Sequence, residues 1–205
     1  MDTHKPSNIH LALLLVVISI FIWSLVKPTS YLDWLAEVSP AVVIILIVLF
    51  TYNKFRFSTL SYIIIAFLSI LTFIGGHYTY SEVPLFNWMK EEFNLKRNHY
   101  DRFGHFFLGF GVIVIRELLL SFTPLKKGAW LSVISVSMVL AVAALYEIIE
   151  WLSTKISKGS QTSKDFLGMK GDQWDAQWDM SLAFIGAILA LILFTKAHDR
   201  WIKNK

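Results

Sequence analysis

Apolar residues run along this chain in six long blocks that short polar segments separate. The blocks span residues 9–27, 35–52, 58–76, 104–122, 129–151 and 178–196. A helix needs roughly 20 mostly apolar residues to cross the hydrocarbon core of a bilayer. We therefore expect an all-α membrane protein, a six-transmembrane-helix bundle that forms a single polytopic domain over residues 1–205.

The composition agrees with this pattern and excludes several kinds of site. Hydrophobic residues make up 55% of the chain and charged residues only 17%, whereas soluble domains carry about 25% charged residues. Cysteine is absent, which excludes disulfides, thiolate metal sites and a cysteine nucleophile. The formal net charge of +4 is spread along the chain. We therefore expect membrane lipids as partners and no nucleic acid. The oligomeric state is left open.

Two short connections indicate the orientation. Residues 53–57, "NKFRF", and residues 123–128, "TPLKKG", carry positive charge and no acid. Short loops rich in Lys and Arg stay on the cytoplasmic side of a membrane. Since six crossings return the chain to its starting side, we predict that both termini lie in the cytoplasm of a bacterial cell, with the protein in the inner membrane.

Ionisable residues recur at one height in four of the expected helices. At a rise of 1.5 Å per residue, His77, His105, Glu147 and Asp179 all lie roughly 26–28 Å from the cytoplasmic ends of their helices. This height corresponds to the extracytoplasmic boundary. The helices should therefore bring imidazole and carboxylate groups to a common level.

The spacing within each motif places these groups on one helix face. The motifs are "YDRFGH", "YEIIE" and "GDQWDAQWD", with acids and a histidine three or four residues apart. Such residues are neighbours on a helix surface, and bundles build metal sites from them. The residues concerned are Asp101 and His105, Glu147 and Glu150, and Asp172, Asp175 and Asp179.

Several carboxylates in a dry pocket require protons or a cation to neutralise them. A divalent metal meets this requirement, and we predict Asp101, His105, Asp175 and Asp179 as its ligands. Oxygen ligands suit Mg²⁺ or Mn²⁺, and a histidine ligand makes Zn²⁺ an alternative.

A simpler interpretation stays open beside this one. The acids would pair with Arg97, Arg102, Lys164 and Lys170, which lie in the same outer connections. Asp172 is either a further member of the site or the N-cap of the last helix. The pattern of residues does not decide between a metal site and an interfacial ion-pair network.

Four more residues are candidates for an extended site. His77 and Tyr78 end the third block, where an ordinary interfacial pair is the alternative. Arg116 and Glu117 of "RELLL" lie about 10–12 Å inside the fourth block. They either reach the cytoplasmic surface or form part of a polar path. His198 is interpreted as a flanking residue.

Five motifs together resemble the YjdF-like family of bacterial inner-membrane proteins. They are "GGHYTYSEVPLFNW", "RNHYDRFGHFFLGF", "RELLL", "YEIIEW" and "GDQWDAQWDM", and the resemblance covers residues 30–196. The pattern D-x-x-x-H, E-x-x-E and D-x-x-x-D is similar, more distantly, to the VanZ-like membrane proteins, in which a Gln usually replaces the second Glu. The resemblance implies a polytopic inner-membrane protein with an acid and histidine site.

Three functions fit these observations. The first is a metal-dependent hydrolase or transferase acting on an envelope lipid or lipid-linked headgroup, in which Glu147 or Glu150 is the general base on a metal-bound water. The second is a small transporter or cation- or proton-binding permease, with Arg116 and Glu117 along the path. The third is a non-catalytic envelope scaffold.

Overall fold

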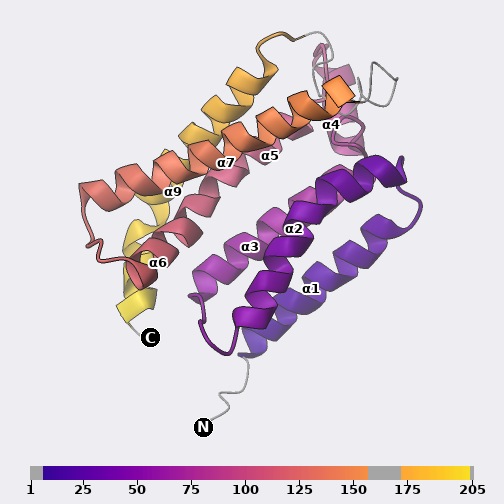
Figure 1. Ribbon diagram of the computed structural model, residues 1–205. Helices are drawn as coiled ribbons and strands as arrows, with labels where there is room; N and C mark the ends of the chain where they lie inside the picture. The colour runs from indigo at the N-terminus through magenta and orange to yellow at the C-terminus, as the bar shows by residue number, and fades with distance from the viewer. Residues whose placement is uncertain (1–6, 157–171, 204–205) are drawn as a thin grey trace.

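The computed structural model describes residues 7–156 and 172–203, and these residues form helices and no strand (Figure 1). The predicted all-α fold with six candidate spans is confirmed. The helices that could cross a membrane are α1 (Asn8–Leu25), α2 (Tyr31–Thr51), α3 (Thr59–His77), the continuous run of α5 (Tyr100–Leu108), η1 (Gly109–Gly111) and α6 (Val112–Phe122), α7 (Ala129–Ile156), and α9 (Asp175–Lys203).

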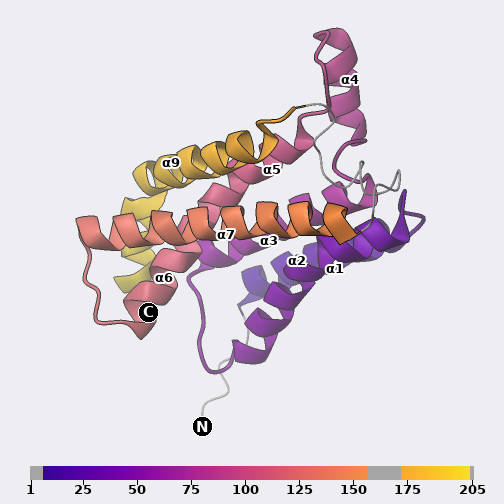
Figure 2. The same ribbon diagram turned by 45° about the horizontal axis from the view of Figure 1, so that its top comes forward.

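A further short helix, α4 (Pro84–Glu92), is too short to cross a membrane. No described side chain of this helix is buried, and Figure 2 shows it standing away from the bundle. Proline at its first turn suits a helix start, because that position needs no backbone N–H. The helix therefore belongs to the connection between α3 and α5.

The helices form two groups that meet at α3. Helices α1 and α2 both pack on α3, while α5, α6, α7 and α9 pack on one another. Helix α3 also touches α5 and α6 and so joins the groups (Figure 1). The start of α1 and the end of α9 lie at the same end of the bundle. The cytoplasmic placement of that end stays a prediction.

Helices α5 and α9 cross at very short range because glycines face each other. A Cβ atom on Gly186 would overlap the carbonyl oxygen of Phe106, and one on Gly109 would overlap the backbone at Ala183. Small residues let helix backbones approach closely inside membranes. This crossing brings Asp179, near the start of α9, beside Asp101 and His105 of α5.

An apolar cluster fills the middle of each group. The first cluster contains Val17, Trp34, Val38, Ala41, Ala66 and Phe73. The second contains Ile64, Val112, Ile113, Val139, Ala187 and Ala190. The buried ionisable side chains lie beyond these clusters, toward the two ends of the helices. The fold therefore separates two polar regions by an apolar layer.

Candidate metal centre

Three ionisable side chains from α5 and α9 meet at one end of the bundle. Asp101, His105 and Asp179 each offer a ligand atom, and these atoms all lie within 4.8 Å of one another. The Nδ1 atom of His105 is 3.5 Å from Oδ1 of Asp101 and 3.6 Å from Oδ1 of Asp179. His105 is 5% exposed and Asp179 only 1% exposed. The group is therefore compact and shielded from solvent and lipid.

Helix α7 adds a carboxylate on the other side of the imidazole. The Oε1 atom of Glu147 lies 3.3 Å from the Nε2 atom of His105. The two ring nitrogens thus face different carboxylates, since Nδ1 faces the aspartates and Nε2 faces Glu147. A ligating histidine commonly gives its second nitrogen to a carboxylate, which fixes its tautomer and ring orientation.

Several buried polar atoms of this group lack a hydrogen-bond partner within the described part of the chain. They are Nδ1 of His105, Oδ1 of Asp179 and Oε1 of Glu147. Such atoms are rare in folded proteins and call for an explanation such as an ion or water. The Oδ2 atom of Asp101 lies 3.9 Å from Nη2 of Arg97. Among the described residues, Asp179 and Glu147 form ion pairs with His105 alone, so these two carboxylates carry excess negative charge when both are ionised. A bound cation would supply both the missing partner and the missing charge.

The carboxylate of Asp175 forms ion pairs with two arginines. Arg97 donates a hydrogen bond to Asp175, and Nη2 of Arg102 lies 3.2 Å from its Oδ1 atom. Asp175 was predicted as a metal ligand, but it is not brought into the Asp101, His105 and Asp179 group. The reason is that its side chain faces the two guanidinium groups, which neutralise it without a metal.

Asp172 likewise pairs with an arginine at the edge of the site. Its Oδ2 atom accepts a hydrogen bond of 2.6 Å from Arg102, and its Oδ1 atom accepts one of 3.0 Å from the backbone N–H of Trp174. The ion-pair interpretation therefore describes this residue. Asp172 is not the N-cap of α9, because the helix begins at Asp175 and the bond to Trp174 lies in the turn before it. Lys164 and Lys170, the other expected partners of the acids, lie outside the described residues.

The charges at this edge shift the pKa values of the groups that lie outside the spans. The Trp174 N–H and the Arg102 guanidinium lower the pKa of Asp172. Burial lowers the pKa of Arg97, but the hydrogen bond and charge of Asp175 outweigh this effect and raise it overall. Burial, helped by the charges of Arg102 and Arg97, lowers the pKa of His99. The edge therefore holds two cations beside a neutral histidine at pH 7.

A family model described as "Predicted membrane protein (DUF2238)" matches residues 9–200. The chain belongs to this family. It is also 34% identical over 203 residues to the inner membrane protein YjdF of Escherichia coli (strain K12), and this match covers 98% of the chain and 96% of that protein. No solved structure matches the chain significantly. With six apolar helices, these matches make this DUF2238 member a multi-pass protein of the bacterial inner membrane, as predicted.

Other residues predicted for the site lie elsewhere or at its margin in this DUF2238 member. Glu150 is half-buried, one turn beyond Glu147 on α7. His77 points to the end of α1, where its Nδ1 atom lies 3.0 Å from the carbonyl oxygen of Ser24. Its ring packs against Trp23 and Tyr78. His77 and Tyr78 thus join α1 to α3 and do not enter the His105 group.

Arg116 and Glu117 form a separate buried network at the opposite end of the bundle. The Glu117 carboxylate accepts hydrogen bonds of 2.6–2.7 Å from Ser58 and Ser61 at the start of α3. His198 lies between the two, with its Nδ1 atom 2.8 Å from Arg116 and its Nε2 atom 3.2 Å from Glu117. The interpretation of His198 as a flanking residue was wrong, because it is fully buried here.

Two residues near the metal centre were not predicted from the sequence. Tyr80 lines a cavity of about 90 Å³ together with Asp101, His105 and Tyr146. Glu37 of α2 is buried and its Oε2 atom has no hydrogen-bond partner among the described residues. Burial raises the pKa of Tyr80 well above its usual range, and the charge of Glu37 acts in the same direction. The sequence did carry a signal for Glu37, because an acid inside an apolar block indicates a functional residue.

Proposed function

We propose that this protein is a metal-dependent hydrolase or transferase that acts on an envelope lipid or a lipid-linked headgroup. The observation that carries the proposal is the buried group of Asp101, His105 and Asp179, whose ligand atoms lie within 4.8 Å of one another. Ionisable residues at this depth are costly and mark function more often than structure. The unpartnered atoms of His105 and Asp179 support a bound cation.

The donor set fits a divalent metal. Asp101 and Asp179 would hold it through carboxylate oxygens and His105 through Nδ1, a combination suited to Zn²⁺, Mn²⁺ or Mg²⁺. When bound, the ion would act as a Lewis acid toward a phosphate or ester oxygen. Because Asp175 pairs with arginines, three side chains form the set, which would leave further coordination positions on the ion for water or a substrate oxygen.

The glutamates of α7 take different roles in this proposal. The Oε1 atom of Glu147 lies 3.3 Å from Nε2 of His105, where its charge would favour a proton on Nε2 and leave Nδ1 free for the metal. Glu147 is therefore a positioning residue. Glu150 lies one turn away on the same helix and is our candidate for the proton acceptor, the role that the sequence leaves open between the two glutamates.

The arginines at the edge support an anionic substrate. Arg97 is buried and Arg102 is partly exposed. The Nε atom of Arg102 is buried and has no hydrogen-bond partner in the part of the chain that the structure describes. A guanidinium group binds phosphate through several N–H donors at once. A phosphate headgroup could therefore lie between Arg102 and the cluster around His105.

A cation or proton relay has less support. The transporter hypothesis requires a polar path from His105 to Arg116 and Glu117, and the apolar cluster around Val112 and Ile113 separates them. The carboxylate of Glu117 is also engaged by Ser58 and His198. These contacts favour a structural role for that end of the bundle.

The proposal is tested by measuring metal content and lipid turnover in matched variants. The wild type, Asp179→Asn and Asp172→Asn are purified and their bound metal is measured by mass spectrometry. We expect the first substitution to abolish metal binding and the second to preserve it, since Asp172 pairs with Arg102 instead. The same proteins are then incubated in nanodiscs with inner-membrane lipids and undecaprenyl phosphates, and the products are profiled.

Metal-dependent turnover that Asp179→Asn removes would support the enzyme. Negligible metal in the wild type would overturn it. Bound metal without turnover of any lipid, together with intact envelope phenotypes for Asp179→Asn at normal protein level, would instead support a scaffold. Flux of cations or protons in proteoliposomes that depends on Glu117 would support the permease.

A further inference from the structure

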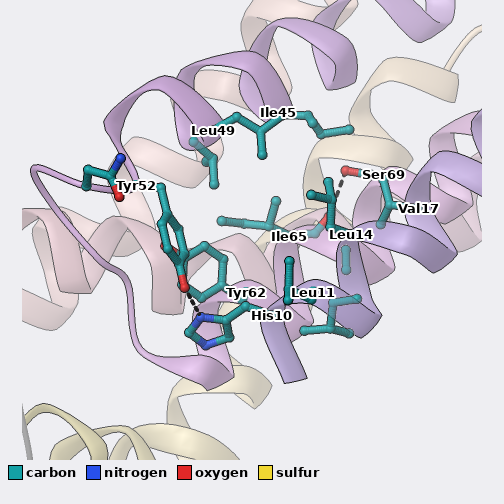
Figure 3. Close-up of a pocket in the computed structure, with 14 residues that line it drawn as sticks. His10, Leu11, Leu14, Val17, Ile45, Leu49, Tyr52, Tyr62, Ile65 and Ser69 are labelled. Carbon is teal, nitrogen blue, oxygen red and sulfur yellow. Dashed lines mark hydrogen bonds between the residues drawn. The ribbon is translucent and has the colours of Figure 1, made fainter. Parts of the chain in front are cut away.

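A second pocket lies between α1 and α2, over α3, at the end of the bundle opposite the metal centre (Figure 3). Helices α1 and α2 each pack along α3 but make few contacts with each other. The space between them has a volume of about 230 Å³. Its walls are mostly Leu, Ile, Val and Ala side chains; those labelled in Figure 3 are Leu11, Leu14, Val17, Ile45, Leu49 and Ile65.

The pocket opens toward the hydrocarbon core of the membrane. Leu11 and Leu49, at its rim, are each 43% exposed, whereas Tyr62 and Ala66 on α3 are buried at its floor. Both rim residues belong to candidate spans, so lipid tails surround the opening. The Ser69 hydroxyl donates to a backbone carbonyl of its own helix, and the Tyr62 hydroxyl accepts a hydrogen bond from the backbone N–H of Phe57. The interior is therefore apolar and accessible to lipid.

One end of this pocket is polar and positively charged. His10 bridges three segments there, with Nδ1 2.9 Å from the Tyr52 hydroxyl and Nε2 3.1 Å from the Thr59 hydroxyl. The guanidinium group of Arg56 lies over the Tyr52 ring, 4.6 Å from its centre. This contact is a cation–π interaction that holds the charge beside the pocket. Lys54, in the same connection, is exposed.

We propose that this pocket binds one acyl chain of an anionic phospholipid, with the phosphate at Arg56. The pocket and the lipid each have an apolar part and a charged end. The apolar walls suit a hydrocarbon chain, and the charged end suits a phosphate. The site is independent of the metal centre and would bind lipid as a ligand without turnover.

The test uses the full-length protein and native mass spectrometry. Purified protein is exchanged into detergent with equal amounts of phosphatidylglycerol and phosphatidylcholine that carry the same acyl chains. We expect phosphatidylglycerol to be retained roughly tenfold better, because the phosphate is common to both lipids but the choline cation of phosphatidylcholine is repelled by the guanidinium group of Arg56. Two pairs of variants then test whether the lipid contacts the pocket walls and Arg56.

The first pair tests the pocket. Leu49→Trp places a bulky ring at the rim, and Ile44→Trp places the same ring on the same helix but outside the pocket, at a residue that is 50% exposed. We expect the first variant to lose bound lipid and the second to keep it. Because both positions are exposed, both variants should fold, which circular dichroism and monodisperse elution would check.

The second pair tests the charge. Arg56→Gln should remove the preference for phosphatidylglycerol, while Lys54→Gln, in the same connection, should preserve it. Equal retention of both lipids by the wild type, or equal binding by Leu49→Trp and Ile44→Trp, would overturn the proposal. Equal losses from Arg56→Gln and Lys54→Gln would also overturn it, because the attraction would then be diffuse.

Discussion

The two ring nitrogens of His105 face chemically different surroundings, and this difference can be tested with single substitutions. Glu147→Gln keeps the shape of the side chain but removes the negative charge beside Nε2. If Glu147 sets the tautomer, metal affinity should fall by roughly 10–100-fold, the usual cost of losing such a partner. Titration calorimetry with Zn²⁺ or Mn²⁺ measures this directly.

Glu150→Gln is the matched control on the same helix. As the proposed proton acceptor, Glu150 should be needed for turnover and not for metal affinity. If the two substitutions weaken metal binding equally, the division of roles between the glutamates is incorrect.

His99, at the N-cap of α5, gives a prediction of pH dependence. Burial lowers its pKa in the folded protein, so folding favours the neutral ring. Its contribution to stability is present above the ordinary pKa of 6.5 and is lost as the pH falls through the lower folded value. The unfolding temperature in detergent should therefore decrease from pH 7 to pH 5.

His99→Gln should make that decrease smaller, since the substituted side chain does not titrate. The difference between the two proteins should be largest at the acidic end and small above pH 7. An identical pH profile for wild type and variant would show that His99 does not contribute.

At this scale the sequence was informative where residues are close along one helix. The i, i+4 pair of Asp101 and His105 is read directly from "YDRFGH". The sequence offered the pairing of Asp175 with Arg97 only as an alternative to a metal site, because the choice depends on how two helix starts meet across the bundle. Burial of His198 was missed for the same reason, since its partners come from α6.

Among the helices, the crossing of α5 and α9 determines whether the metal centre can form. Gly186→Ala would place a Cβ atom against the Phe106 carbonyl oxygen, and separating the helices would move Asp179 away from His105. We expect a loss of about 1–3 kcal/mol of stability, typical of overpacking, together with weaker metal binding. Chemical unfolding in detergent and metal analysis measure the two effects.

Gly111→Ala is a suitable control for this substitution. An added Cβ atom there would meet only Leu68, at 3.9 Å. Since Ala is the better helix former, this variant should be as stable as the wild type or slightly more stable. Equal destabilisation by both substitutions would mean that the crossing is not tightly packed.

The lengths of the helices show what apolar blocks can and cannot predict. All six blocks correspond to helices, because a bilayer requires each crossing to be long, apolar and internally hydrogen-bonded. The last block was expected over residues 178–196, but α9 extends from Asp175 to Lys203. Its polar ends continue as helix because arginines pair with Asp175 at the start and with Asp199 near the end.

Across the whole molecule, Glu117 connects the two groups of helices at the end opposite the metal centre. Its carboxylate accepts hydrogen bonds from Ser58 at the start of α3 and lies 3.2 Å from His198 of α9. Removing one member of a buried charged network costs about 3–5 kcal/mol. We therefore expect Glu117→Ala to lower the free energy of unfolding by an amount in this range.

Asp199→Asn is the control for that loss. Asp199 also pairs with Arg116, at 2.8 Å, but it is partly exposed. Solvent-exposed ion pairs contribute about 0–1 kcal/mol, so this variant should be much less affected. A small effect from Glu117→Ala would show that the helix groups are held together by their apolar contacts alone.

The orientation of the bundle determines which leaflet the metal centre serves. We expect a C-terminal alkaline phosphatase fusion to be inactive and a C-terminal green fluorescent protein fusion to be fluorescent, because the short positive connections favour a cytoplasmic C-terminus. Alkaline phosphatase inserted after Glu82, in the connection between α3 and α4, should be active. This result would place Asp101, His105 and Asp179 at the outer leaflet, where an externally exposed headgroup is the substrate. The opposite pattern would move the centre to the cytoplasmic leaflet, and the substrate would then be a lipid exposed to the cytoplasm.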